Sequence, residues 1–286
     1  MSASLPVSDF RRKVWRWTHT RERPLPWRGE RDPYRILVSE VMLQQTQASR
    51  VVEPYLAFLA RFPSVAALAG SDAADVLHEW GSLGYPRRAL NLWRAAKSVV
   101  ERGGFPRAVA ELQELPGVGP YTARAVATFA FDAHVGVVDA NVRRVYERCF
   151  GASDLQAIAD GFVPRGAAAR WNQAMIDLGA EVCRPRDPRC DECPVRSLCS
   201  WDGTFRTSRT APRFETTARY ARGRVVDALR EGPTTTSELL RRTNLARDRV
   251  DDALRTLTDD GLVHRRGARY VLGPASERAN ATAKRR

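Results

Sequence analysis

Lysine is almost absent from this sequence: of the 46 basic residues, only Lys13, Lys97 and Lys284 are lysines. Long apolar runs are absent too, since no stretch approaches the roughly 18 residues of a membrane-spanning helix. Residues 1–12 lack the apolar region of a secretory signal peptide, and the alternating pattern of strands is missing before residue 200. We therefore expect a cytoplasmic protein without membrane contact, whose residues 1–200 are helical.

The charge balance indicates the kind of partner. The 46 basic and 33 acidic residues give a formal net charge of +13, and such an excess favours a polyanion, most simply nucleic acid. A chain of 286 residues is long enough for two domains. We expect a monomer, associated with the nucleoid if the source is bacterial or archaeal.

Helical patterns fill the first predicted domain, residues 1–200. Asp32 followed by Pro33 is typical of a helix start, because proline suits the first helical position. The expected helices are Phe10–Trp17, Tyr34 to beyond Gln47, Asp72–Trp80 with Ser71 as its cap, Arg87–Arg102, Asn141–Cys149 and Arg170–Cys183.

A polar, basic linker is expected at residues 201–216, followed by a second domain at 217–273. Its pattern of three helices and a terminal hairpin indicates a small winged-helix-like α+β unit. The expected elements are helices Ala218–Glu231, Ser237–Arg242 and Asp248–Asp259 and strands Leu262–Arg265 and Ala268–Leu272. The third helix is rich in aspartate and poorly suited to phosphate. Packing and binding of a partner are therefore the alternatives to DNA contact as the role of this domain. Residues 274–286 are expected to form a disordered tail.

The segment from Leu115 to Asp139 carries the first functional pattern. Gly117 and Gly119 form a tight bend before a helix, and the free amides of a helix start can bind an anion such as a phosphate. A small-residue stretch then leads to the carboxylate of Asp139. The pattern fits a hairpin that holds a nucleic-acid backbone while an acid acts on the sugar. A plain helix-turn-helix connection with a surface acid is the alternative.

Glu40 is a carboxylate within an apolar helical stretch. It could be a solvated outlier, but Val41, Met42 and Leu43 follow it, so we expect partial burial. Burial raises the pKa of a carboxyl group, which suits a general acid.

Four cysteines, Cys183, Cys190, Cys193 and Cys199, fall in a Cys-x6-Cys-x2-Cys-x5-Cys window. Four thiolates this close can hold one centre, either zinc or an iron–sulfur cluster. Zinc ribbons have two Cys-x2-Cys pairs and this window has one, which favours the cluster over zinc and over four unrelated thiols. Cys149 lies on an apolar helix and is expected in the core.

Together the cysteine window, the LPGVG bend and VVDANVRRV resemble the helix-hairpin-helix DNA glycosylases that carry a [4Fe-4S] loop. The segments LPWR (25–28), SEVMLQQTQ (39–47), LGY (83–85) and WNQAMIDLG (171–179) are similar to those of adenine glycosylases, the MutY type. The resemblance covers residues 9–199 and implies a two-lobed, mainly α fold, a [4Fe-4S] cofactor on the four cysteines, and double-stranded DNA with a mispaired adenine as the partner.

The resemblance also implies roles for individual residues. Glu40 matches the acid that protonates adenine, and Asp139 the carboxylate that stabilises or traps the sugar cation, an arrangement that retaining glycosidases share. Tyr121 and Asn141 match a catalytic tyrosine and a supporting asparagine. The matched DNA-contacting residues are Arg28 in the base pocket, Gln45 and Tyr85, which wedge into the duplex near the flipped base, Leu83 in the same LGY segment, Thr46 facing the opposite guanine, and Gly117 and Gly119 on the backbone.

These matches imply a base-excision-repair glycosylase that flips adenine out of mispairs with 8-oxoguanine or guanine and removes it hydrolytically. Relatives with lyase activity carry a lysine where Tyr121 stands, for a Schiff base with the sugar, and no lysine occurs between Lys97 and Lys284. We therefore expect a monofunctional hydrolase. A thymine or uracil mismatch glycosylase and a non-catalytic DNA-binding protein are the alternatives; Glu40 argues against the first, and the pair of Glu40 and Asp139 against the second.

Two departures from the family bear on specificity. Many adenine glycosylases have a C-terminal Nudix-like domain that reads 8-oxoguanine, whereas this sequence predicts a winged-helix-like unit instead. Pro86 stands where a second tyrosine is common. Recognition of the opposite base is therefore less firmly implied than adenine excision.

Overall fold

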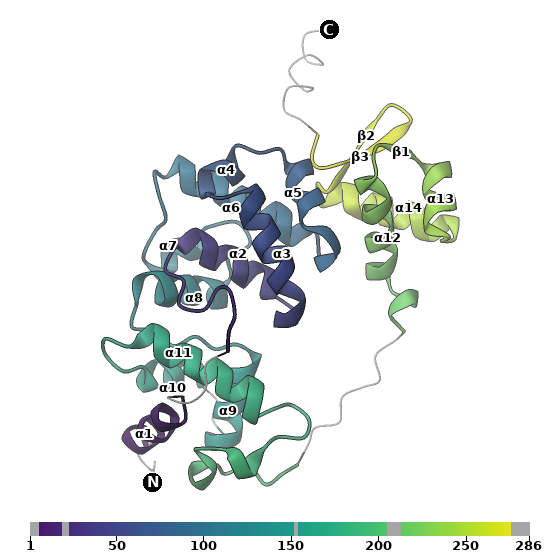
Figure 1. The fold of residues 1–286 in the computed structure, drawn as a ribbon. Helices are drawn as coiled ribbons and strands as arrows, with labels where there is room; N and C mark the ends of the chain where they lie inside the picture. The colour runs from purple at the N-terminus through teal and green to yellow at the C-terminus, as the bar shows by residue number, and fades with distance from the viewer. Residues whose placement is uncertain (1–5, 19–22, 152–153, 205–212, 276–286) are drawn as a thin grey trace. The chain divides into compact units, whose positions relative to one another are not determined.

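The computed structural model of the protein describes residues 6–18, 23–151, 154–204 and 213–275 (Figure 1). The chain forms two compact units, and it crosses between them more than once. The first unit contains Met1–Glu40 and Phe105–Thr207, and the second contains Val41–Gly104 and Ser208–Arg286. The predicted boundary at residue 200 remains a prediction, as does the linker; the tail from residue 276 on lies outside the described residues.

The first unit is built from helices around an aromatic core. Figure 1 shows α1, α9, α10 and α11 grouped together, and contacts join α1 to α10 and α11 and join α9 to both. Phe10 of α1 packs edge-on against Phe162 at 5.1 Å between ring centres and contacts Tyr146 and Trp171. The helices are α1 (Val7–Thr18), α2 (Pro33–Leu43, which crosses into the second unit), α7 (Val109–Gln113), α8 (Pro120–Phe131), α9 (Ala140–Phe150), α10 (Leu155–Phe162) and α11 (Ala168–Asp177), which continues as one π turn, η2 (Leu178–Val182).

The second unit begins with a group of helices after residue 47. Phe58, Phe62 and Trp80 form its aromatic centre, with Phe58 in contact with both other rings. The elements are α3 (Ala48–Arg61), α4 (Val65–Ala69), α5 (Ala73–Glu79), the 3-10 turn η1 (Gly81–Leu83) and α6 (Arg87–Glu101). Among the described residues of both units, no helix has the length and apolar character needed to cross a membrane.

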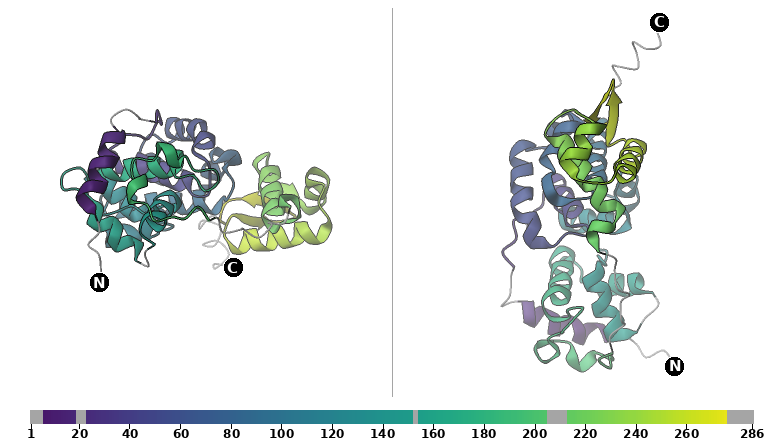
Figure 2. Two further views of the ribbon diagram at one scale, coloured as in Figure 1. Left: turned by 90° about the horizontal axis from the view of Figure 1, so that it is seen from below. Right: turned by 90° about the vertical axis from the view of Figure 1, so that its right-hand side faces the viewer.

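The C-terminal part of the second unit has the predicted three helices and hairpin. Figure 2 shows its helices grouped together in green and yellow-green. They are α12 (Ala218–Arg230), α13 (Thr236–Thr243) and α14 (Arg247–Asp259), preceded by the 3-10 turn η5 (Phe214–Thr216). The strands β2 (Val263–Arg266) and β3 (Arg269–Leu272) pair antiparallel, and a short strand that the sequence did not predict, β1 (Thr234–Thr235), adds to β3 in the order β1-β3-β2.

Two local predictions need correction. The helix expected to run past Gln47 ends at Leu43, and the chain turns through Gln45, whose φ of 56° lies in the left-handed region, before α3 begins. Ser71 does not cap α5: its hydroxyl donates to Leu68 O, and Asp72 is the cap residue, without a side-chain bond. The start of α2 is confirmed, because Pro33 is its first residue and Asp32 accepts from the Tyr34 amide.

Candidate active site

Glu40 is buried near the end of α2, as its apolar neighbours predicted. Glu40 is 6% exposed. Burial raises the pKa of Glu40 to about 7, and the charge of Asp139 contributes a smaller part. The Tyr121 hydroxyl, from the first turn of α8, hydrogen-bonds the carboxyl group. The second oxygen, Oε2, is buried and has no hydrogen-bond partner among the described residues. One oxygen of a titratable carboxyl group therefore lacks a hydrogen-bond donor from the described protein residues.

The charges of both acids, Glu40 and Asp139, act on the hydroxyl group of Tyr121. Burial and the charges of Glu40 and Asp139 raise the pKa of Tyr121 well above its ordinary value. The phenol therefore stays protonated at neutral pH and acts as a hydrogen-bond donor to Glu40.

Asp139 is held at the start of α9 by the helix itself. As the cap residue it accepts hydrogen bonds on Oδ1 from the amides of Asn141 and Val142, at 2.9 and 2.7 Å. Oδ2 accepts from Asn141 Nδ2 at 2.8 Å. Three donors at the start of a helix fix the direction of this carboxyl group. Asn141 thus supports Asp139 directly.

Arg144 connects this carboxylate to the cysteine window. Its Nη2 donates to Asn141 Oδ1 at 2.8 Å and to Gly179 O at 2.7 Å, and its Nε donates to Cys183 O. A side chain at Gly179 would meet Asn141 within 2.6 Å, so the π turn can approach α9 only because residue 179 is glycine. Arg144 lies in VVDANVRRV, but no pattern in the sequence indicates this role.

The bend before α8 has the expected hairpin form. Val118 N donates to Leu115 O at 3.0 Å, and Gly117, at φ 75°, occupies the left-handed region that a side chain disfavours. Gly119 has an ordinary φ of −84°, so its backbone does not need glycine; instead, the position of a Cβ atom there faces open space. No side chain caps the start of α8 at Gly119, and such a helix start can face an anion.

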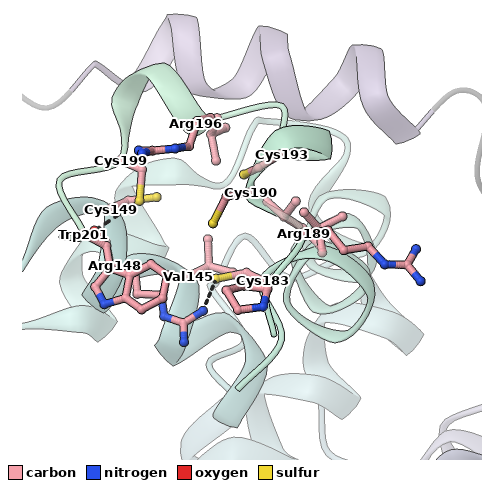
Figure 3. A pocket seen from close by; sticks show the side chains of 14 residues that line it. Val145, Arg148, Cys149, Cys183, Arg189, Cys190, Cys193, Arg196, Cys199 and Trp201 are labelled. Atoms are coloured by element: carbon pink, nitrogen blue, oxygen red, sulfur yellow. Dashed lines mark hydrogen bonds between the residues drawn. The ribbon is translucent and has the colours of Figure 1, made fainter. Parts of the chain in front are cut away.

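The four cysteines of the window line one pocket, together with Cys149 (Figure 3). Figure 3 shows the sulfur atoms of Cys183, Cys190, Cys193 and Cys199 around a common space. Among the described residues, no three His, Cys, Asp or Glu side chains converge as ligands of a single metal ion. The prediction that Cys149 belongs to the core is confirmed, since it is buried among the residues around Phe10. It also lines the pocket, which the sequence analysis did not anticipate.

Positive charge borders this thiol-lined pocket. Arg148 Nη1 donates to Cys183 Sγ at 3.3 Å, while the guanidinium of Arg148 stacks over the Trp201 ring at 4.0 Å. The pKa of Cys199 is lowered to about 6, chiefly because its sulfur accepts a hydrogen bond from Cys149. Soft thiolate ligands beside guanidinium groups fit an anionic iron–sulfur centre.

Arg28 is held by an acid that the sequence analysis missed. Its Nη2 lies 2.7 Å from both oxygens of Asp177, in α11, and Arg23 lies 3.7 Å from the same carboxylate. Burial raises the pKa of Asp177 despite these partners. Arg28 Nε is buried without a partner among the described residues. The signal was present in the sequence, because Asp177 is the one acid of the WNQAMIDLG segment.

The remaining predicted residues lie in two loops of the second unit. Gln45 and Thr46 belong to the turn between α2 and α3, and Tyr85, at φ 49°, follows η1. Gln45 is exposed and Tyr85 half-buried, whereas Leu83 is only 5% exposed. Leu83 is therefore a core residue in this conformation, and we omit it from the DNA-contacting set.

Arg88, at the start of α6, ties these two loops together. Nη1 donates to the carbonyls of Val41, Met42 and Gln44, and Nη2 donates to Leu83 O and Gly84 O at 3.1 and 3.2 Å and to Thr46 Oγ1 at 3.3 Å. Burial lowers the pKa of Arg88 to about 10, which leaves it charged at neutral pH. No sequence pattern predicts these hydrogen bonds of Arg88, because most of their acceptors are backbone atoms.

Comparison with known families and sequences agrees with this arrangement. Residues 38–159 match the HhH-GPD superfamily of base excision DNA repair proteins. The sequence is 40% identical over 281 residues to the adenine DNA glycosylase of Mycolicibacterium smegmatis, covering 91% of this chain and 95% of that protein. The Mycobacterium tuberculosis adenine DNA glycosylase is 40% identical over 272 residues, covering 87% and 88%.

Solved structures agree in fold. A thermostable thymine-DNA glycosylase superposes with a TM-score of 0.65 at 32% identity, covering 68% of this chain and 95% of that one. An endonuclease III trapped as a covalent intermediate with DNA has a TM-score of 0.60 at 22% identity, covering 69% and 97%, and supports the fold alone. The predicted mainly helical glycosylase fold is thereby confirmed.

Proposed function

This chain belongs to the adenine DNA glycosylase family of the HhH-GPD superfamily, and we propose that it removes adenine mispaired with 8-oxoguanine or guanine in double-stranded DNA, hydrolytically and without strong lyase activity. The observation that carries the proposal is Glu40: a buried carboxyl with a pKa near 7 and one oxygen without a partner.

Glu40 acts as the general acid in this proposal. Adenine is a poor leaving group until a ring nitrogen is protonated, so a neutral carboxyl must stand beside the flipped base. At pH 7 about half of a group with a pKa near 7 carries its proton. The unpaired Oε2 offers the position from which the proton passes to the base while the glycosidic bond breaks. The ionised Glu40 then accepts a proton from the attacking water.

Asp139 stabilises the sugar as that bond breaks. The departing base leaves positive charge on the sugar, and a fixed carboxylate lowers the free energy of that state. The donors from α9 fix the direction of the Asp139 carboxyl group, whereas burial raises the pKa of Glu40, so the two acids have different roles because their surroundings differ. Tyr121 donates to Glu40, and Asn141 orients Asp139.

The absence of lysine supports a monofunctional enzyme. A Schiff base needs an amine near the sugar, and residues 98–283 contain no lysine. Tyr121 cannot form such a base. The expected product is an abasic site whose strand breaks only when alkali is added.

The remaining predicted residues have supporting roles. The bend at Gly117 and Gly119, followed by the uncapped start of α8, suits a phosphate of the backbone, and Arg28, oriented by Asp177, suits a polar edge of the base. Gln45 and Tyr85 would enter the duplex beside the flipped base, and Thr46 would face the opposite guanine. The left-handed turns at Gln45 and Tyr85 support these roles, because turns project side chains from a rigid base.

Cys183, Cys190, Cys193 and Cys199 would hold a [4Fe-4S] cluster. The cluster would supply a covalent cross-link between four points of the chain. Arg148 would neutralise part of its charge through Cys183, and Arg144 would hold the adjoining backbone to Asn141.

A single-turnover excision assay tests the proposal on four duplexes: adenine opposite 8-oxoguanine, adenine opposite guanine, thymine opposite guanine, and uracil opposite guanine. Each is read with and without alkali. We expect strand cleavage only for the two adenine duplexes and only after alkali. Asp139→Asn should abolish excision while binding to the mispaired duplex persists; loss of both together would contradict its role.

A thymine mismatch glycosylase is the second candidate, because a thymine-DNA glycosylase is among the structural neighbours at 32% identity. Cleavage of thymine or uracil in place of adenine would make it the correct function. The rates on the two adenine duplexes also report whether 8-oxoguanine is recognised.

A further inference from the structure

Aromatic and arginine side chains alternate between the Tyr85 loop and the start of α12, within the second unit. The guanidinium of Arg88 lies 5.2 Å from the centre of the Tyr85 ring. The guanidinium of Arg219 lies 5.3 Å from the same ring, donates to the Tyr85 hydroxyl, and lies 5.0 Å from the Phe214 ring. Phe214 in turn packs edge-on against Tyr220 at 5.5 Å. We call Tyr85, Phe214 and Arg219 the aromatic–arginine surface.

This surface is open to solvent. Phe214 is 49% exposed and Arg219 is exposed as well. Within the part of the chain that the structure describes, Arg219 pairs with no carboxylate, so its charge is not neutralised by the protein. An exposed aromatic ring beside an unneutralised guanidinium is the combination that nucleic-acid-binding proteins use, since rings stack on bases or sugars and arginine binds phosphate.

The rest of the C-terminal part does not offer the same chemistry on its third helix. In α14, Arg247 lies 3.5 Å from Asp251, and Arg255 pairs with Asp252 and Asp259. These two arginines are neutralised within one turn, and the third, Arg249, is half-buried and donates to the carbonyls of Glu215 and Thr217. The helix that a winged-helix reader would place on DNA is therefore less suited to phosphate than the start of α12.

Contacts elsewhere hold α12 against the helices after residue 47. Arg230 Nε donates to Leu77 O at 3.1 Å, and Arg87 lies 3.2 Å from Asp260 at the end of α14, which in turn pairs with Arg222 of α12. These contacts keep Arg219 and Phe214 beside Tyr85 without using the side chains of the surface itself.

We propose that the aromatic–arginine surface binds the duplex next to the mispair, with Arg219 on a backbone phosphate and Phe214 against a neighbouring sugar or base. The C-terminal part then contributes to DNA binding through the start of α12 and not through α14. The inference rests on the proposed function in one respect, the role of Tyr85 at the duplex.

Binding measurements on the full-length chain test this, with a fluorescent duplex that carries adenine opposite 8-oxoguanine. All proteins carry Asp139→Asn so that the duplex is not consumed. Phe214→Ala with Arg219→Ala should raise the Kd by about 10- to 100-fold and lower the slope of log K against log salt by about 0.9 for the lost phosphate contact. Arg219→Lys alone, which keeps the charge, should recover part of the affinity.

Arg247→Ala is the matched control, because it removes one exposed positive charge from the same C-terminal part. We expect less than about a threefold change in its Kd, because Asp251 already neutralises Arg247. Equal losses in the control and in the double variant would overturn the proposal, since the effect would then be net charge alone. An unchanged Kd in the double variant would also overturn it.

Tighter binding by the double variant would overturn the proposal in another way, by indicating that Arg219 holds Tyr85 away from DNA. Melting temperatures within about 2 °C of the parent would show that the variants remain folded. Adenine excision by the unaltered protein tests the proposed function separately, so failure of one idea is distinguishable from failure of the other.

Discussion

The substitution Glu40→Gln tests the proposed acid through stability as well as through activity. Glutamine has nearly the same size and shape but cannot ionise. We expect it to abolish excision, because no proton can be delivered to the base. We also expect it to stabilise the fold at alkaline pH, where the wild-type protein contains a buried carboxylate with an unpaired oxygen.

The size of the stability effect follows from the pKa of Glu40. Its value of about 7 in the fold compares with 4.5 for an ordinary glutamate, and each pKa unit corresponds to 1.36 kcal/mol, so the difference amounts to about 3 kcal/mol. A carboxyl group whose pKa is raised contributes stability that is fully present below pH 4.5 and is lost as the pH rises through 7. Relative to wild type, the glutamine variant should therefore gain up to about 3 kcal/mol between pH 4.5 and pH 8.

Urea unfolding at intervals between pH 5 and pH 8.5 measures this difference, with tryptophan fluorescence as the signal. Glu53→Gln, at an exposed glutamate of α3, controls for the loss of one negative charge. Excision by the wild type should fall about tenfold for each pH unit well above 7, as Glu40 loses its proton.

A stability difference between the glutamine variant and wild type that is the same at pH 5 and pH 8.5 would refute this reasoning. It would mean that Glu40 ionises at its ordinary pKa, and then Glu40 could not supply a proton at neutral pH.

Three further substitutions follow from the packing. Gly179→Ala should destabilise the protein by about 1–3 kcal/mol and slow excision, because the added Cβ would meet Asn141 at 2.6 Å; thermal unfolding measures the first effect. Arg88→Lys should cost about 2–3 kcal/mol in unfolding free energy and weaken duplex binding, since lysine cannot reach all the carbonyls, whereas Arg94→Lys, at an exposed arginine of α6, should change both little. Cys190→Ser should remove visible iron–sulfur absorbance and lower DNA affinity.

Each of these has a result that would count against it. Gly161, in α10, has open space where a Cβ would lie, so Gly161→Ala should not destabilise; an equal loss at both glycines would show that the contact with Asn141 is not the cause. Equal effects of the two arginine substitutions would show that charge, not the hydrogen bonds, matters. A Cys190→Ser protein with unchanged absorbance would contradict the ligand set.

Local sequence patterns were sufficient to predict many of the helices. The start of α2 follows from Asp32 and Pro33, and the burial of Glu40 follows from the apolar residues that surround it. The three C-terminal helices and the hairpin followed from spacing in the same way. Each of these features depends on residues within a few positions of one another, which a sequence displays directly.

The end of α2 could not be read in this way. Residues 44–47 have no proline or glycine, and their composition permits a continuous helix. The break depends on Arg88, which lies more than forty residues away in the sequence. Its guanidinium donates hydrogen bonds to the carbonyls at the end of α2, which would otherwise need the amides of a further helical turn. The role of Asp177 could not be predicted for a similar reason, because it depends on a contact with Arg28, which is distant in the sequence.

Arg88 and Arg144 solve the same physical problem, and the solution explains why arginine suits these positions. Each lies where a helix ends and leaves backbone carbonyls without partners: Arg88 at the end of α2, and Arg144 beside the π turn that ends α11. A guanidinium carries five N–H donors in a planar fork and so can satisfy several carbonyls at once, whereas an ammonium offers three donors from a single point. In both cases the satisfied carbonyls border residues of proposed function, Gln45 in one and Asn141 in the other. The scarcity of lysine thus has a structural counterpart: residues 98–283 contain no lysine that could form a Schiff base, and two helix ends are held by guanidinium groups that lysine could not replace.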